Sequence, residues 1–240
     1  MLISSLALAH EPKNNSETTH VQGHADSPDQ EVIVNHHTFV HPFVAHMGMP
    51  DEPGEVSVRV MSVAERNAGL VSGTYGFHLE AGVSDRLGLH LRNDAVATHN
   101  RTEMMLQYAV LKSGENGIAL IGEVEFPTGP TTDNQKKYLY GVSFAYTWET
   151  LVSVNSVAHY RPQEKMTEWE IAFVSRLNEK IYPVFEFRGE ADKDMSMANA
   201  LLALKFKILN GNAIGFGYQV PISTDREYDS QLIAEVEFNF

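Results

Sequence analysis

Histidine is concentrated near the start of the chain, where its ring nitrogens can act as metal ligands. Seven of the eleven histidines lie between residues 10 and 53, together with Met47 and Met49. A neutral imidazole is a common ligand for zinc and copper ions, and a thioether suits Cu(I). Because their spacing matches no diagnostic ligand motif, the alternative is a solvated segment whose histidines bind nothing. The predicted ligands of a Cu or Zn site are His36, His37, His41 and His46.

Charged side chains recur at every second position along much of the chain, and they form the second set of candidates. Glu123 and Glu125 are separated by one apolar residue, as are Glu186 and Arg188. Since both signs occur, cross-strand ion pairs can form. These rows of alternating charged residues indicate either a structural network that stiffens a barrel or a polar pore that selects solutes. The residues predicted to line the lumen are Arg59, Glu80, Arg92, Glu123, Glu125, Glu170, Arg176, Glu186 and Arg188.

Catalytic chemistry has less support in the sequence. The absence of cysteine excludes thiolate nucleophiles, thiolate metal sites and disulfides. His159 has Ser153 and Ser156 nearby, the residue types that an outer-membrane lipid hydrolase or acyltransferase uses. No G-x-S-x-G or H-E-x-x-H motif places a nucleophile beside a base. The sequence therefore predicts no catalytic residue, and a lipid-modifying enzyme is the third-ranked alternative.

The elements that carry the charged rows must be strands, because alternate residues of a strand point to opposite faces. In residues 139–148, for example, Tyr140, Val142, Phe144 and Tyr146 share one face. Twelve strands are predicted in this way, and nothing has the period of a helix. They lie near residues 55–66, 73–81, 87–92, 103–112, 118–126, 139–148, 151–160, 167–177, 181–188, 197–208, 214–220 and 232–240.

The connections distinguish a membrane barrel from a soluble sandwich or lipocalin-like barrel, which shows the same alternation. Connections after even-numbered strands are short, such as 82–85 and 209–212, whereas 94–102 and 127–137 are longer and polar. Short turns at one end and long loops at the other are typical of outer-membrane barrels. We therefore predict an all-β fold: a closed antiparallel transmembrane β-barrel of about 12 strands over residues 54–240, in the outer membrane of a Gram-negative bacterium.

Aromatic residues near the strand ends agree with that interpretation, because outer-membrane barrels carry aromatic girdles at both membrane interfaces. One end would hold Trp148. The other would hold Phe126, Tyr160, Trp169 and Phe187.

The first fifty residues differ from the rest in composition. Residues 1–9 are apolar and end in an A-x-A form, so we expect a truncated secretory signal peptide, with an accidental match as the alternative because a basic n-region is missing. Residues 10–53 are polar and interrupted by Pro, Gly, Asn and Asp, which predicts a flexible, disordered His-rich arm. We expect this arm to lie outside the barrel or partly in its mouth.

The end of the chain carries a resemblance. The segment 230–240 alternates apolar residues and finishes on Phe238, Asn239 and Phe240, which resembles the C-terminal signature of bacterial outer-membrane barrels. The resemblance implies that Phe238 and Phe240 form an assembly signal read by the barrel-assembly machinery, and that the last strand closes the barrel against the first.

A narrower resemblance covers about the last half of the chain. GEVEFPTGP at 122–130, YPVFEFRGE at 182–190 and FGYQVPIS at 216–223 are similar to the outer-membrane family named for the meta-pathway of phenol degradation. That family consists of outer-membrane transporters, and the shared motifs are structural.

Composition and resemblance together predict the function and the partners. A net charge of −13 argues against nucleic acid as a partner. We predict a passive channel or transporter for small solutes that contacts outer-membrane lipid. The alternative is a non-conducting structural or metal-binding barrel.

Overall fold

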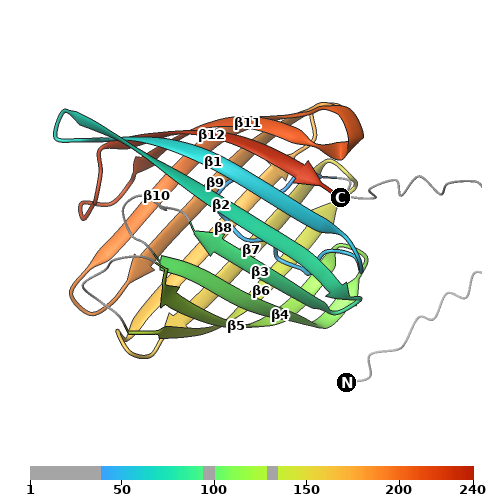
Figure 1. Ribbon diagram of the computed structural model, residues 1–240, viewed down its shortest axis with the longest axis horizontal. Helices are drawn as coiled ribbons and strands as arrows, with labels where there is room; N and C mark the ends of the chain where they lie inside the picture. Colours follow the sequence, from blue (N-terminus) through green and yellow to red (C-terminus); the bar gives the residue numbers. More distant parts are fainter. Residues whose placement is uncertain (1–38, 94–100, 129–134) are drawn as a thin grey trace, which may run out of the picture. The chain divides into compact units, whose positions relative to one another are not determined.

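The computed structural model describes residues 39–93, 101–128 and 135–240, which form one closed antiparallel β-barrel (Figure 1). Each strand pairs with its neighbours in the sequence, and β12 pairs with β1, so the predicted 12-stranded barrel is confirmed. The predicted signal peptide and residues 10–38 of the predicted arm lie outside the described residues. The strands are β1 (Val56–Asn67), β2 (Leu70–Ser84), β3 (Leu87–Asn93), β4 (Arg101–Ser113), β5 (Asn116–Pro127), β6 (Lys137–Trp148), β7 (Val152–Arg161), β8 (Met166–Ser175), β9 (Ile181–Ala191), β10 (Ser196–Lys207), β11 (Ala213–Pro221) and β12 (Ser230–Asn239), with a single 3-10 turn at Leu209–Gly211.

The seam between the first and last strands closes the barrel as predicted. Val58 pairs with Phe238 in the antiparallel register of β1 and β12. Beyond the last assigned strand residue, the Phe240 amide donates to the Val56 carbonyl at 2.9 Å, and the Val56 amide donates to the Phe240 carbonyl at 3.2 Å. The C-terminal residue is therefore bonded to the start of β1.

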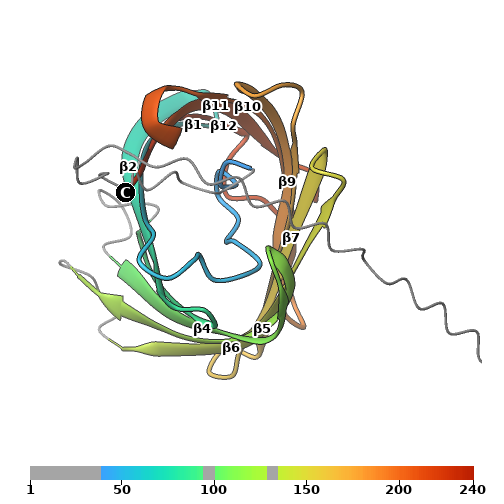
Figure 2. The ribbon, with the colours of Figure 1, turned by 90° about the vertical axis from the view of Figure 1, so that its right-hand side faces the viewer.

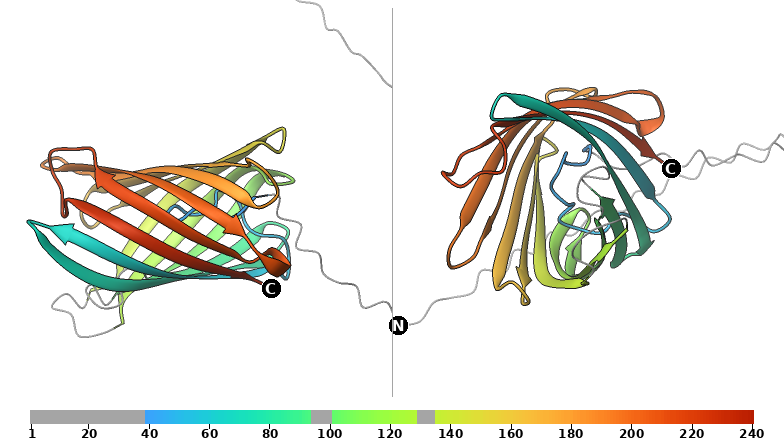
Figure 3. Two further views of the ribbon diagram at one scale, coloured as in Figure 1. Left: turned by 90° about the horizontal axis from the view of Figure 1, so that it is seen from above. Right: turned by 60° about the vertical axis from the view of Figure 1, so that its left-hand side comes forward.

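The two ends of the barrel differ in their connections. The turn end holds the short connections 85–86, 114–115, 149–151, 176–180 and 208–212, together with the start of β1 and the end of β12. The opposite end, the loop end, holds the connections after the odd-numbered strands. One of these is a two-residue turn in which Ala68 and Gly69 have φ of 48° and 83°, the left-handed pair of a type I′ hairpin. Figures 1 and 3 show the strands crossing obliquely between the two ends.

Large apolar side chains cover the outer face of the strands. On β6, Val142, Phe144 and Tyr146 are 42–50 % exposed, while Ser143 and Ala145 between them are buried inside. Trp148 ends β6 at the turn end, and Tyr160 lies near the loop end of β7. This surface is what a barrel exposes when its surroundings are lipid. Among the described residues, no helix has the length and apolar composition to cross a membrane.

Residues 39–51 lie inside the barrel and residues 52–53, which lead to β1, are exposed; we call residues 39–53 the lumenal segment. Figures 2 and 3 show this segment surrounded by the strands, and Phe43 and His41 are almost fully buried there. Our placement of the arm outside the barrel or in its mouth was therefore wrong for this segment. The physical reason is that its apolar side chains and its backbone find partners on the inner wall.

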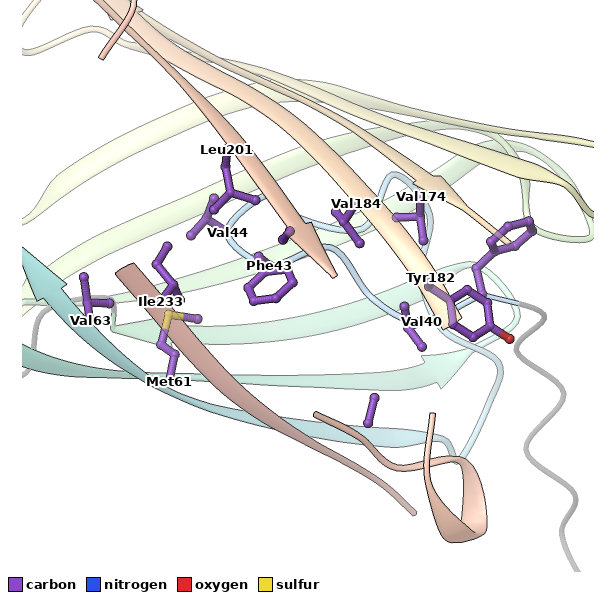
Figure 4. Close-up of a cluster of buried hydrophobic side chains, with 13 residues drawn as sticks. Val40, Phe43, Val44, Met61, Val63, Val174, Tyr182, Val184, Leu201 and Ile233 are labelled. Carbon is purple, nitrogen blue, oxygen red and sulfur yellow. The ribbon is translucent and has the colours of Figure 1, made fainter. Parts of the chain in front are cut away.

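The inner wall beside the lumenal segment is apolar on one side. Residues of the segment pack there against inward-facing side chains of β1, β8, β9, β10, β11 and β12 (Figure 4). Burying one large apolar side chain such as Phe43 contributes about 1.5–3 kcal/mol. The cluster consists of Phe39, Val40, Phe43, Val44, Met61, Val63, Val174, Tyr182, Val184, Leu201, Ala203, Ala213 and Ile233.

Candidate functional site: the lumenal segment and its seat

Glu186 on β9 anchors the middle of the lumenal segment. Its carboxylate accepts hydrogen bonds from three successive backbone amides, those of Phe43, Val44 and Ala45, and the last two measure 3.0 Å each. The segment has no regular secondary structure, so its buried amides need partners from elsewhere. Glu186, which we predicted to line the lumen, therefore binds the backbone of the lumenal segment rather than water.

Two cations bind the carbonyls that precede these amides. Arg59 Nη1 on β1 donates to the Pro42 carbonyl at 2.6 Å, and Lys205 Nζ on β10 donates to the same oxygen at 3.2 Å. Arg59 also pairs with Glu80, and Lys205 pairs with Glu237 at 3.0 Å. Both cations are fully buried, so their carboxylate partners are what makes that burial tolerable.

The second half of the segment is bound to side chains of β3, β6, β7 and β8. His46 places both its backbone amide and its Nδ1 atom 2.9 Å from Glu170 Oε2, and Arg92 Nη1 lies 3.4 Å from Glu170 Oε1. The Gly48 amide donates to Asn155 Oδ1 at 2.9 Å, and the Ser143 hydroxyl donates to the Gly48 carbonyl at 2.8 Å. The segment is thus held by side chains from many strands rather than by one.

Two glycines allow the close approach of segment and wall. A Cβ atom on Gly48 would lie 2.1 Å from the Phe144 carbonyl oxygen, which belongs to the wall backbone. A Cβ atom on Gly215 of β11 would lie 2.5 Å from the Phe43 ring. The fit of the segment therefore depends on the lack of a side chain at both positions.

His41 lies in a group of carboxylates. Its Nδ1 atom is 2.7 Å from Glu237 Oε1, and its Nε2 atom is 3.6 Å from Asp51 Oδ1 and 3.7 Å from Glu80 Oε2. Burial alone would lower the pKa of His41, but Glu237 and Asp51 outweigh it and raise that pKa to about 10. The carboxylates therefore favour a protonated His41 ring at neutral pH.

His46 has the opposite electrostatics. Burial lowers its pKa below the ordinary value, against Glu170, and Arg92 and His90 lower it further. The His90 and His159 rings lie at nearly equal distances from the His46 ring, with centroids 6.1 Å and 6.0 Å from its centroid. The two described histidines of our predicted metal site thus occupy different surroundings, and His36 and His37 lie outside the described residues.

The lumenal segment separates two cavities. The loop-end cavity, about 780 Å³, reaches the segment at Val44 and His46. The turn-end cavity, about 570 Å³, reaches it at Phe39, Val40, Met47 and residues 49–53. The two cavities have no described lining residue in common.

Acidic residues outnumber basic ones in the loop-end cavity: among the described residues, ten acidic and six basic side chains line it. Arg161 binds Glu168 at 2.6 Å and Glu125 at 3.3 Å, and His159 Nδ1 lies 3.6 Å from Glu123 Oε2. Arg188 also lines this cavity. These contacts place the carboxylates of the charged rows where a solute would enter from the loop end.

The structure sorts the predicted lumen residues by position. Arg59, Glu80 and Glu186 face the lumenal segment, and Arg92 and Glu170 contact it and also line the loop-end cavity. Arg176 lies instead in the turn that follows β8. Sequence reasoning missed the inward apolar cluster, as well as Gln107, Ser143 and Asn155.

Ser156 and His159 lie on opposite faces of β7, because they are three residues apart and alternate residues of a strand face opposite sides. Ser153 faces inward like His159, but it is six residues away, about 20 Å at about 3.3 Å per residue. The serines named in the sequence analysis are therefore not placed to be activated by His159.

Comparison with known proteins identifies the fold. No protein-family model matches the chain, and no curated protein matches it. Among solved structures, an outer-membrane channel from Pseudomonas putida F1 matches with a TM-score of 0.59 and 9 % identity, covering 82 % of this chain and 99 % of that one. The NanC porin matches with a TM-score of 0.54 and 9 % identity, covering 76 % and 97 %. The chain therefore has a fold that outer-membrane porins and channels adopt.

Proposed function

We propose that this protein is an outer-membrane channel for small solutes and that its lumenal segment closes the pore. The observation that carries the proposal is the separation of two lumenal cavities by residues 39–53. If the segment moves aside, the two cavities join along the barrel axis. The apolar outer face and the similarity in fold to outer-membrane channels support the membrane assignment.

The charge of the loop-end cavity gives the channel a preference. Because ten acidic side chains face six basic ones, the local potential attracts cations and small cationic solutes. Measuring the reversal potential of single channels in a salt gradient tests this preference. A cation-selective sign supports the proposal, and an anion-selective sign contradicts it.

A non-conducting barrel is the second candidate, and the many bonds that hold the lumenal segment favour it. Planar-bilayer recordings and liposome swelling separate the two functions. A structural barrel gives no current and no swelling even after the segment has been loosened, and changing Arg92 or Arg188 to Glu would then alter stability without altering flux.

We propose the remaining partners on the same grounds. The apolar outer face of the strands contacts outer-membrane lipid. The strand that ends on Phe240 is the segment that the barrel-assembly machinery reads. We propose no enzymatic activity, which the positions of Ser153, Ser156 and His159 support. Lipid hydrolysis by the refolded protein, lost in His159→Ala, would overturn this.

We also propose a relationship to the outer-membrane family named for the meta-pathway of phenol degradation. The supporting segments are Phe126-Pro127-Thr128, where β5 ends, and Gln219-Val220-Pro221, where β11 ends. Proline is suited to such strand ends because it cannot donate to the ladder.

A further inference from the structure

We propose that His41, Asp51 and Glu80 form a binding site for a divalent transition-metal ion, with Zn²⁺ as the representative ion, and that this ion fastens the lumenal segment to β2. His41 and Asp51 come from the two ends of the segment, and Glu80 comes from the wall. The site extends beyond the channel function and does not depend on it.

The spacing of the ligand atoms fits such an ion. One ligand atom from each residue can be chosen so that all three lie within 4.8 Å of one another. His41 Nε2 lies 3.6 Å from Asp51 Oδ1 and 3.7 Å from Glu80 Oε2, which is slightly long for direct hydrogen bonds. Ligands about 2.0–2.2 Å from a tetrahedral zinc ion lie about 3.4 Å apart, so the two distances from His41 need to contract by only a few tenths of an ångström, and the Asp51 and Glu80 oxygens already lie within 4.8 Å of each other.

The surroundings orient the ligands. Glu237 lies 2.7 Å from His41 Nδ1, and a carboxylate on that atom leaves Nε2 to bind a metal, as in carboxylate–histidine–zinc arrangements. Glu80 is 2 % exposed, and its Oε2 atom, which faces His41, makes no hydrogen bond to any described residue. That buried oxygen is the second observation that points to a ligand.

The charges around the site balance with a divalent ion. Four carboxylates, those of Asp51, Glu80, Glu235 and Glu237, are linked through His41 and through two permanent cations of the described residues, Arg59 and Lys205. His90 is a further titratable neighbour, with Nδ1 at 3.7 Å from Glu80 Oε1. A metal ion bound to His41 replaces the proton that the carboxylates favour on this ring; with both imidazoles then neutral, this group carries two negative charges in excess, which one divalent ion cancels.

The donor set selects among metals. An imidazole with two carboxylates suits zinc, whereas Mg²⁺ and Ca²⁺ prefer oxygen alone. Met49 packs among Ala109, Ala119 and Ala145, so it provides no thioether here for Cu(I). Asp51 lines the turn-end cavity, which supplies a path for the ion and a water molecule for the fourth coordination position.

The test measures Zn²⁺ binding to the refolded full-length protein by competition with a chromogenic chelator. Asp51→Asn and Glu80→Gln should each bind one Zn²⁺ fewer than wild type. Glu52→Gln removes the same charge from the neighbouring exposed residue and should bind as wild type does. Zinc bound by histidines elsewhere in the chain is common to all these variants and cancels in the comparison.

A second measurement protects the test against misfolded variants. Co²⁺ should give the visible absorption of a tetrahedral nitrogen and oxygen site in wild type and in Glu52→Gln, but not in Asp51→Asn, whose change lies on the segment rather than in the barrel wall. Glu237→Gln should weaken Zn²⁺ binding by about 10–100-fold while keeping its stoichiometry. Equal stoichiometry and affinity in Asp51→Asn, Glu80→Gln and wild type would overturn the site, whether or not the barrel conducts.

Discussion

At the scale of single residues, the inward-facing charges have a role that differs from the one their alternation suggests. Glu186 is a buried residue of β9, and its carboxylate accepts hydrogen bonds from three backbone amides of another part of the chain. A buried carboxylate that accepts several amide hydrogen bonds has its hydrogen-bonding needs met, and so do the buried amides that donate to it. Such a residue can hold an irregular segment that has no ladder hydrogen bonds of its own.

Glu186→Gln should loosen the lumenal segment without opening the barrel. The amide side chain keeps one acceptor oxygen but turns a donor toward donors, and an unmade buried bond costs about 1–3 kcal/mol. We expect faster hydrogen exchange at the amides of residues 43–45, measured by mass spectrometry. Glu179→Gln, in the exposed turn after β8, is the control; equal exchange in the two variants would contradict the anchoring role.

Deleting Phe240 should reduce the amount of barrel in the outer membrane and leave precursor in the periplasm. The deletion removes the last bonds to Val56 and the aromatic residue that ends the proposed assembly signal. Quantitative blotting of membrane fractions measures the effect. Tyr218→Ala removes an exposed aromatic from neighbouring β11 and should assemble normally. Equal assembly of the deletion and the control would remove this explanation of the chain end.

At the scale of elements, the strands could be predicted and the lumenal segment could not. Alternation fixes which side chains share a face, and all twelve strands follow from it. The segment contains Pro42, Gly48, Pro50 and Pro53, which break every period and are typical of a loop. Its backbone hydrogen bonds go to side chains on strands far away in the sequence, so no local sequence pattern predicts them.

A signal for an occupied lumen was nevertheless present. Several strands carry apolar residues at consecutive positions, such as Val60-Met61, Leu201-Leu202 and Leu232-Ile233. A strand that is apolar on both faces is buried on both faces. In a barrel with lipid outside, this pattern predicts that another part of the chain fills the lumen. Met61, Leu201 and Ile233 belong to one apolar cluster with the lumenal segment.

Acid should release the segment through His46. Because its folded pKa lies below the ordinary value of 6.5, the neutral ring contributes docking stability that is present above about pH 6.5 and is lost as the pH falls through the lowered pKa. Glu170, Arg92, His90 and His159 face the ring. We therefore expect single-channel current to increase below about pH 6.5 and to depend less on pH in His46→Gln. An unchanged pH profile in His46→Gln would contradict this.

At the scale of the whole molecule, the barrel and the site differ in how far the sequence determines them. Closure of β12 on β1 and the difference between turn end and loop end follow from alternation and connection length. The site depends on contacts between residues 39–53 and strands as distant as β12. His41 illustrates the limit. A histidine can be recognised in the sequence as a candidate metal ligand, but its contacts with Asp51, Glu80 and Glu237 are known only from the three-dimensional structure.

The most direct test of the central claim, that the lumenal segment closes a conducting pore, is the conductance of Gly48→Ala in planar bilayers. The added Cβ would lie 2.1 Å from the Phe144 carbonyl oxygen, so the segment must shift while the wall stays closed. Gly122→Ala is the control, because no atom lies within 4 Å of the Cβ it adds to β5. We predict larger or more frequent openings in Gly48→Ala than in wild type and in Gly122→Ala. Identical currents in all three proteins, with Gly48→Ala folded, would contradict the account.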